Sequence, residues 1–72
     1  MTAEEWIERF AEVTGTAPPG EAEVAKLLDL AAEAAHSSER IAAPIACWIA
    51  GRQGLDLDEA ITLADQIGDP QT

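Results

Sequence analysis

The sequence has few of the residues that catalysis, cross-linking or nucleic-acid binding requires. Its 72 residues include one cysteine, one histidine, one phenylalanine and no tyrosine, and four basic residues stand against fourteen acidic ones. A single cysteine cannot form an internal disulfide, so nothing indicates an oxidising compartment. Phosphate groups are bound by clustered lysine and arginine, and an acidic chain is repelled by anionic membranes. We therefore expect neither a nucleic acid nor a membrane as partner.

Long apolar runs are also missing. No segment approaches the roughly 18 apolar residues of a membrane-spanning helix. The first residues, MTAEEW, lack the basic and apolar regions of a signal peptide. With the lone cysteine, these absences predict a cytoplasmic protein. The length predicts a single domain over residues 1–72 with a small core, because so short a chain buries only about 60% of the surface that it exposes when unfolded.

The residues that are abundant favour helices. Apolar residues make up 47% of the chain, and they are mostly alanine, leucine and isoleucine, a composition that is poor in β-branched residues overall. Apolar side chains recur at helical spacing in four segments. The fold class predicted is all-α, a compact bundle of four short helices with antiparallel neighbours. The predicted helices cover residues 3–14, 21–35 and 43–53, and a last one begins after an acidic cap at Asp56 and is stopped by Gly68 and Pro70.

Capping and turn residues set these boundaries. Thr2, followed three residues later by Glu5, predicts a capping box, and Gly15 provides a left-handed stop. The paired prolines of TGTAPPG, residues 14–20, predict a linker. Pro44 fits the first turn of the third helix, because its missing N–H is not needed there.

The same spacing predicts which side chains face inward. Leu28, Ile49 and Ile61 are expected inside, and Trp6 and Trp48 are interpreted as core anchors. Partial exposure of either tryptophan at a partner interface is the alternative. The other inward positions predicted are Ile7, Phe10, Val13, Val24, Leu27, Ala31, Ala35, Ile45, Ala60, Ala64 and Ile67.

Two candidate sites are better explained as structure. Glu33 and His36 have the Glu-x-x-His spacing of di-iron bundles, but such bundles need two of these motifs and two further glutamates. The chain has one histidine, which the negative end of a helix favours. We therefore expect no metal and no cofactor. Cys47 is expected to pack, since free cysteine is among the most buried residue types.

The candidate binding residues are His36, Arg40 and Glu33. His36 and Arg40 bracket a helix end in an otherwise acidic chain and could hold an anion or a partner's carboxylate. The alternative is that Arg40 pairs with a nearby acid, Glu39 or Glu33. An acid–base enzyme using Glu33 and His36 is disfavoured, because so small a chain offers little concavity for a pocket. We expect a protein that is not an enzyme and has no catalytic residue.

One run, LLDLAAEAAHSSERIAAPIACWIAG, resembles a small actinobacterial domain family associated with molybdenum-cofactor biosynthesis. In that family a helix with an early tryptophan precedes a Leu-Leu-Asp-Leu-Ala helix ending in Ala-His, followed by an arginine, an Ala-Ala-Pro step and a helix ending in glycine. The matching positions are Trp6, Leu27 to Ala31, Ala35, His36, Arg40, Ala42 to Pro44 and Gly51.

The resemblance implies an accessory domain found with molybdopterin guanylyltransferase-like proteins, and it carries over no catalytic residue. The function predicted is a non-enzymatic protein-interaction module, monomeric or homodimeric, whose partner is a molybdenum-cofactor enzyme. The alternative function is a small-ligand, anion or metal-binding helical domain that acts through His36 and Arg40.

Overall fold

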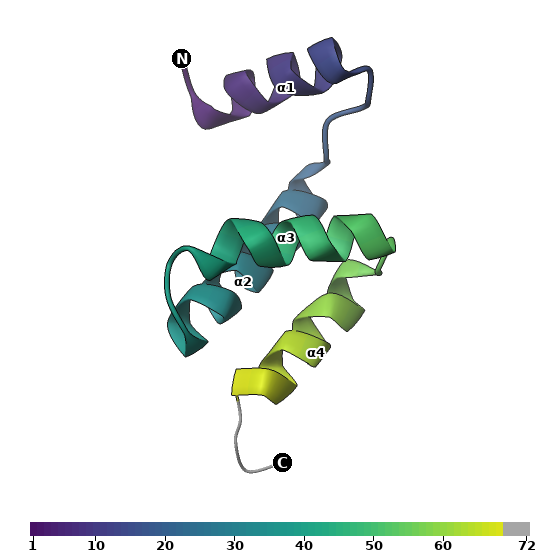
Figure 1. Ribbon diagram of the computed structural model, residues 1–72. Coiled ribbons are helices and arrows are strands. Elements are labelled where there is room, and N and C mark those ends of the chain that lie inside the picture. Colours follow the sequence, from purple (N-terminus) through teal and green to yellow (C-terminus); the bar gives the residue numbers. More distant parts are fainter. Residues whose placement is uncertain (69–72) are drawn as a thin grey trace.

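The computed structural model describes residues 1–68, which form four helices and no strand (Figure 1). The predicted all-α bundle of four short helices is confirmed. The expected stop at Pro70 lies outside the described residues. The helices are α1 (Ala3–Thr14), α2 (Glu21–Ser37), α3 (Ala42–Gln53) and α4 (Leu57–Gly68).

The helix ends follow local chemistry. At the start of α1 the Thr2 N–H donates to Glu5 Oε1 at 2.8 Å and the Glu5 N–H donates to Thr2 Oγ1 at 3.1 Å, so the predicted capping box is present. Gly15 and Gly54 end α1 and α3 at φ values of 80° and 66°, the left-handed conformation that glycine adopts without steric cost. At the start of α4 the Glu59 N–H donates to Asp56 Oδ2, as the acidic cap predicts.

Two boundaries differ slightly from the prediction. α2 continues to Ser37 because the hydroxyls of Ser37 and Ser38 donate to the carbonyl oxygens of Glu33 and Ala34, both at 2.7 Å. These bonds tie both serines to carbonyl oxygens four residues earlier on the helix. α3 begins at Ala42, one residue earlier than predicted.

α2 is the central helix, and it packs against both α3 and α4. The core where they meet consists of Leu30, Ala50 and Ala60, surrounded by the partly buried Cys47, Leu55, Ile61 and Ala64. A single ion pair among the described residues ties α2 to α4, with Lys26 Nζ 2.9 Å from Asp58 Oδ2. The hydrogen bond to Asp58, together with that carboxylate's charge, raises the pKa of Lys26.

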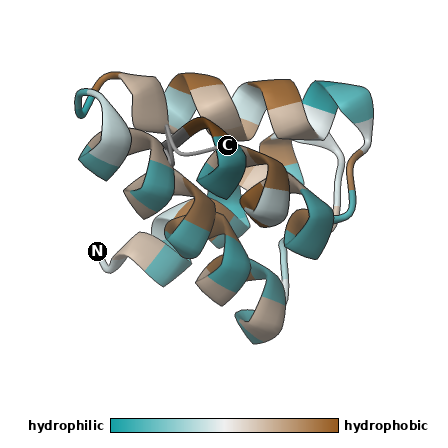
Figure 2. Ribbon diagram, turned by 90° about the horizontal axis from the view of Figure 1, so that it is seen from below, coloured by the Kyte–Doolittle hydropathy of each residue, from teal (hydrophilic) through white to brown (hydrophobic). Residues whose placement is uncertain are grey.

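α1 stands at one end of the molecule, joined to α2 by residues 15–20 (Figure 1). It leaves most of the outer surface of α2 and α3 uncovered, since the extensive interhelical contacts are those of α2 with α3 and α4. Figure 2 shows the consequence: hydrophobic turns of α3, the uppermost helix in that view, lie at the edge of the molecule.

Several predictions about the core are therefore wrong. Leu28 is 64% exposed, and Ile49, Trp6 and Trp48 are also exposed. The buried residue of α2 is Leu30, which is 3% exposed and lies outside the predicted stripe. The reason is that α3 and α4 both pack on α2 and meet over Leu30, which turns Leu28 outward. Ile61 packs against the core, as predicted. Phe10, Val13, Ile45 and Ile67 are exposed as well.

Replacing Leu30 and Leu28 in turn tests this packing. Leu30→Ala should lower the free energy of unfolding by roughly 2 to 5 kcal/mol, because it leaves a cavity among the three helices. Leu28→Ala, a matched substitution two residues earlier, should change it by no more than about 0.5 kcal/mol. Urea denaturation of both variants at one protein concentration measures the difference. Equal losses would mean that α2 is rotated from the orientation described.

Candidate functional site

The three candidate binding residues lie at the end of α2 and in the turn that follows. Glu33 is half-buried on α2, His36 is exposed in the last turn, and Arg40 is exposed between α2 and α3. Glu33 and His36 are neighbours on the helix surface because of their spacing of three. Within residues 1–68 Arg40 forms no ion pair with Glu33 or Glu39. Its guanidinium group is therefore available to solvent.

These residues do not line a cavity. Neither Glu33, His36 nor Arg40 borders any of three surface hollows that the described residues form. Residues 1–68 also bring together no group of three histidine, cysteine or acidic side chains that could hold a metal ion. The end of α2 and the turn after it, which we call the junction, therefore present an exposed histidine and an exposed arginine.

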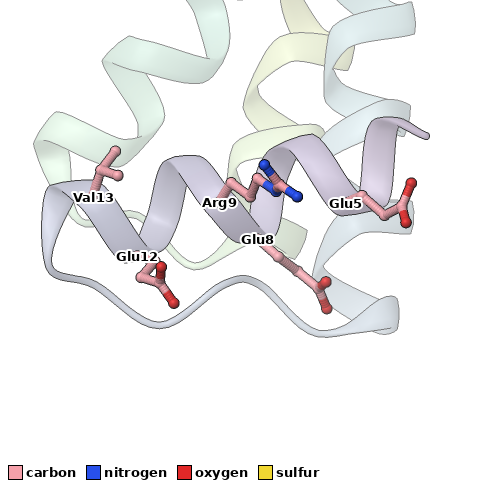
Figure 3. A pocket seen from close by; sticks show the side chains of 5 residues that line it. All are labelled: Glu5, Glu8, Arg9, Glu12 and Val13. Carbon is pink, nitrogen blue, oxygen red and sulfur yellow. The ribbon is translucent and has the colours of Figure 1, made fainter. Parts of the chain in front are cut away.

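One hollow lies along the outer side of α1. Its walls are Glu5, Glu8, Arg9, Glu12 and Val13. Figure 3 shows that the carboxylates of Glu5, Glu8 and Glu12 point apart instead of converging on one point. Side chains arranged in this way are a solvated acidic face and do not form a catalytic or metal site.

A second hollow, of about 570 Å³, lies between α1 and the first turns of α2. Apolar side chains from both helices line it, Ile7 from α1 and Val24 and Leu28 from α2, together with the linker prolines. No histidine, cysteine or lysine borders it. The titratable residues that line it are Glu4, Glu8 and Glu21.

Cys47 packs as predicted. Its side chain is half-buried on α3 against the core, and its Sγ lies 3.8 Å from the carbonyl oxygen of Leu27 on α2. Burial raises the pKa of the Cys47 thiol. A raised pKa keeps the thiol protonated near neutral pH, whereas a catalytic cysteine needs the thiolate.

The most distinctive surface is apolar and belongs to two helices. We call Trp6, Phe10 and Val13 the α1 stripe, and Ile45, Trp48 and Ile49 the α3 face; all six side chains are exposed. The rings of Trp6 and Phe10 stack with centroids 5.1 Å apart. The guanidinium carbon of Arg52 lies 5.0 Å from the centroid of the Trp48 ring.

The α3 face has no acidic residue near it in the helix. From Ala42 to Gln53 the only charged residue is Arg52, although fourteen acids are spread over the rest of the chain. This absence is visible in the sequence, but an almost uncharged helix is ordinarily a buried one, so the sequence carried no signal that α3 exposes its large apolar side chains.

Comparison with known proteins gives the family. The model of a family described as a domain of unknown function (DUF6457) matches residues 1–67. The chain belongs to the DUF6457 family. No curated protein and no solved structure matches it.

Over residues 1–68, no helix of this DUF6457 domain is sufficiently long and apolar to cross a bilayer. Its ionisable side chains are dispersed over the surface, and its largest apolar side chains are exposed.

The thiol of the DUF6457 domain provides a test of its packing. We expect Cys47 to react with a disulfide reagent at pH 8 several-fold more slowly in the folded chain than in urea, because burial raises its pKa and lowers the thiolate fraction. The absorbance of the released thiolate measures the rate. The Cys47→Ser chain, which lacks a thiol, is the control. Faster reaction in the folded chain would indicate an activated thiol.

Proposed function

We propose that this DUF6457 domain is a non-enzymatic interaction module that docks on a partner protein through the α3 face. The observation that carries the proposal is Trp48, which is 60% exposed on a helix without acidic residues and has Arg52 against its ring. Tryptophan and arginine are the residue types most enriched among those that dominate interface energies. An exposed apolar patch rimmed by polar residues is typical of an interaction site.

The small core supports the same proposal. The helices of the α2–α3–α4 unit bury Leu30, Ala50 and Ala60, while Ile45, Trp48 and Ile49 remain outside. Burial of apolar surface contributes roughly 25 cal/mol per Å². Large apolar side chains that remain in water therefore stabilise a complex when a partner covers them. A surface of this kind on a protein of 72 residues favours binding over catalysis as the role.

The proposed partner is a molybdenum-cofactor enzyme of the molybdopterin guanylyltransferase-like class, and the proposed setting is the actinobacterial cytoplasm. The support is the resemblance carried by the run from Leu27 to Gly51, which includes the whole α3 face. The lone cysteine is compatible with a reducing compartment.

Titration calorimetry with a guanylyltransferase-like protein from the same organism tests the proposal. We expect measurable binding that weakens at least tenfold, about 1.4 kcal/mol, in Trp48→Ser. Ile67→Ser, which also replaces an exposed apolar residue but on α4, should leave the affinity unchanged. Equal affinity for the wild-type and Trp48→Ser chains would show that the partner does not bind at the α3 face.

A second candidate function, anion or carboxylate binding at His36 and Arg40, is favoured by one observation. Both side chains are exposed, and Arg40 has no ion pair among residues 1–68. An arginine that is not already paired can bind a carboxylate or phosphate in a bidentate manner.

Arg40→Ala separates a binding role from a structural one. If the junction binds anions, the variant should keep its melting temperature, because an exposed unpaired side chain contributes little to stability. It should also lose the chemical-shift changes of His36 that inorganic phosphate produces in the wild-type chain. Arg52→Ala, an exposed arginine at the far end of α3, is the control. If phosphate does not change the chemical shifts of His36 in the wild-type chain, this function is contradicted.

A further inference from the structure

The α1 stripe and the α3 face are complementary to each other. Both belong to helices of 12 residues, about 18 Å long at the rise of an α-helix. Each presents a tryptophan and aliphatic or aromatic neighbours at helical spacing: Trp6, Phe10 and Val13 on one, Ile45, Trp48 and Ile49 on the other. The two surfaces therefore match in length and in chemistry.

Their charges are complementary as well. α1 carries Glu4, Glu5, Glu8 and Glu12 with one arginine, Arg9, which is a net charge of −3, whereas α3 carries no acid and one arginine, Arg52, which is a net charge of +1. In a chain whose net charge is −10, the α3 face is the surface that repels an acidic amphipathic helix least. Among the helices of residues 1–68, α1 therefore fits the α3 face best.

Within one chain the two surfaces do not meet. α1 is held at the end of the molecule by the linker of residues 15–20, which contains Pro18 and Pro19. Consecutive prolines favour a stiff, extended backbone. Trp6 is 55% exposed there, so its own α3 does not cover it.

We propose that the α3 face is occupied by α1 of a second copy of this chain, in a two-fold symmetric dimer with two equal α1–α3 contacts. The proposal rests on the proposed function, because it assigns an occupant to the same docking face in the isolated protein. A larger partner would then displace α1 from α3.

The area available is sufficient for such a dimer. Trp6, Phe10 and Trp48 are each more than half exposed, which amounts to on the order of 100 Å² per ring. Six rings in two copies supply roughly 600 Å², before the aliphatic residues Val13, Ile45 and Ile49 are counted. The sum approaches the ~1,000 Å² that a specific interface requires. The stacking of Trp6 on Phe10 and the contact of Arg52 with the Trp48 ring also restrict these side chains before association. This restriction lowers the entropy lost when the dimer forms.

The mass of the full chain in solution tests the dimer. Sedimentation equilibrium from micromolar to millimolar concentration should show a rise from 7.6 kDa to twice that value. Phe10→Ser and Trp48→Ser should each raise the dimer dissociation constant at least roughly tenfold, because each damages both contacts. Ile67→Ser, exposed on α4, should leave it unchanged. A wild-type chain that stays at 7.6 kDa throughout would overturn the proposal without any variant.

Mixing the two damaged chains tests which surfaces meet. A dimer of Phe10→Ser with Trp48→Ser retains one undamaged contact, between α1 of the second and α3 of the first. Native mass spectrometry of an equimolar mixture should therefore show mixed dimer in clearly more than the twofold excess over each homodimer that random pairing gives. If α1 packs on α1, the undamaged contact lies instead in the homodimer of Trp48→Ser, and if α3 packs on α3, it lies in the homodimer of Phe10→Ser. Mixed dimer at or below that twofold excess would overturn the reciprocal arrangement.

These measurements distinguish failure of the dimer from failure of the proposed function. A chain that remains monomeric but binds the guanylyltransferase-like protein through Trp48 overturns the dimer alone. A chain that dimerises through α1 and α3 but does not bind that protein supports the dimer and overturns the partner.

Discussion

The close approach of α3 and α4 to α2 determines most of what this molecule presents to its surroundings. The contact is built on Leu30, Ala50 and Ala60, and alanine allows helix axes to come near each other because it has almost no side chain. Such a contact buries little area for each residue, so it cannot also accommodate tryptophan or isoleucine. The large apolar residues of α3 are consequently directed outward. An exposed Trp48 is thus a result of how the core is made.

Local features of the sequence were sufficient to predict the helices. The capping box of Thr2 and Glu5, the glycines that end α1 and α3, and the acidic cap at Asp56 act over three or four residues and are readable in the sequence. The orientation of each helix about its axis was not predictable in the same way. Leu28 and Leu30 are both leucines of one helix, and only the positions of α3 and α4 decide which of them is buried.

The candidate site shows the same division. Reasoning from the sequence identified Arg40 and His36 as polar residues near a helix end, and the structure leaves both exposed. It treated Trp6 and Trp48 as core anchors, because a large aromatic residue at helical spacing is more often buried than exposed. That rule assumes a core large enough to receive the ring. In a chain of 72 residues whose helices meet through alanine, the assumption fails.

The acidity of the chain gives the exposed apolar residues their selectivity. A protein that exposes several large apolar side chains associates with many surfaces unless something prevents it. Here eleven acidic residues lie on α1, α2 and α4, and they repel acidic surfaces that approach these three helices. α3 is free of them from Ala42 to Gln53. For the docking proposed at the α3 face, this distribution disfavours contact with acidic surfaces on the other helices and not on α3, which is how an interface becomes specific as well as favourable.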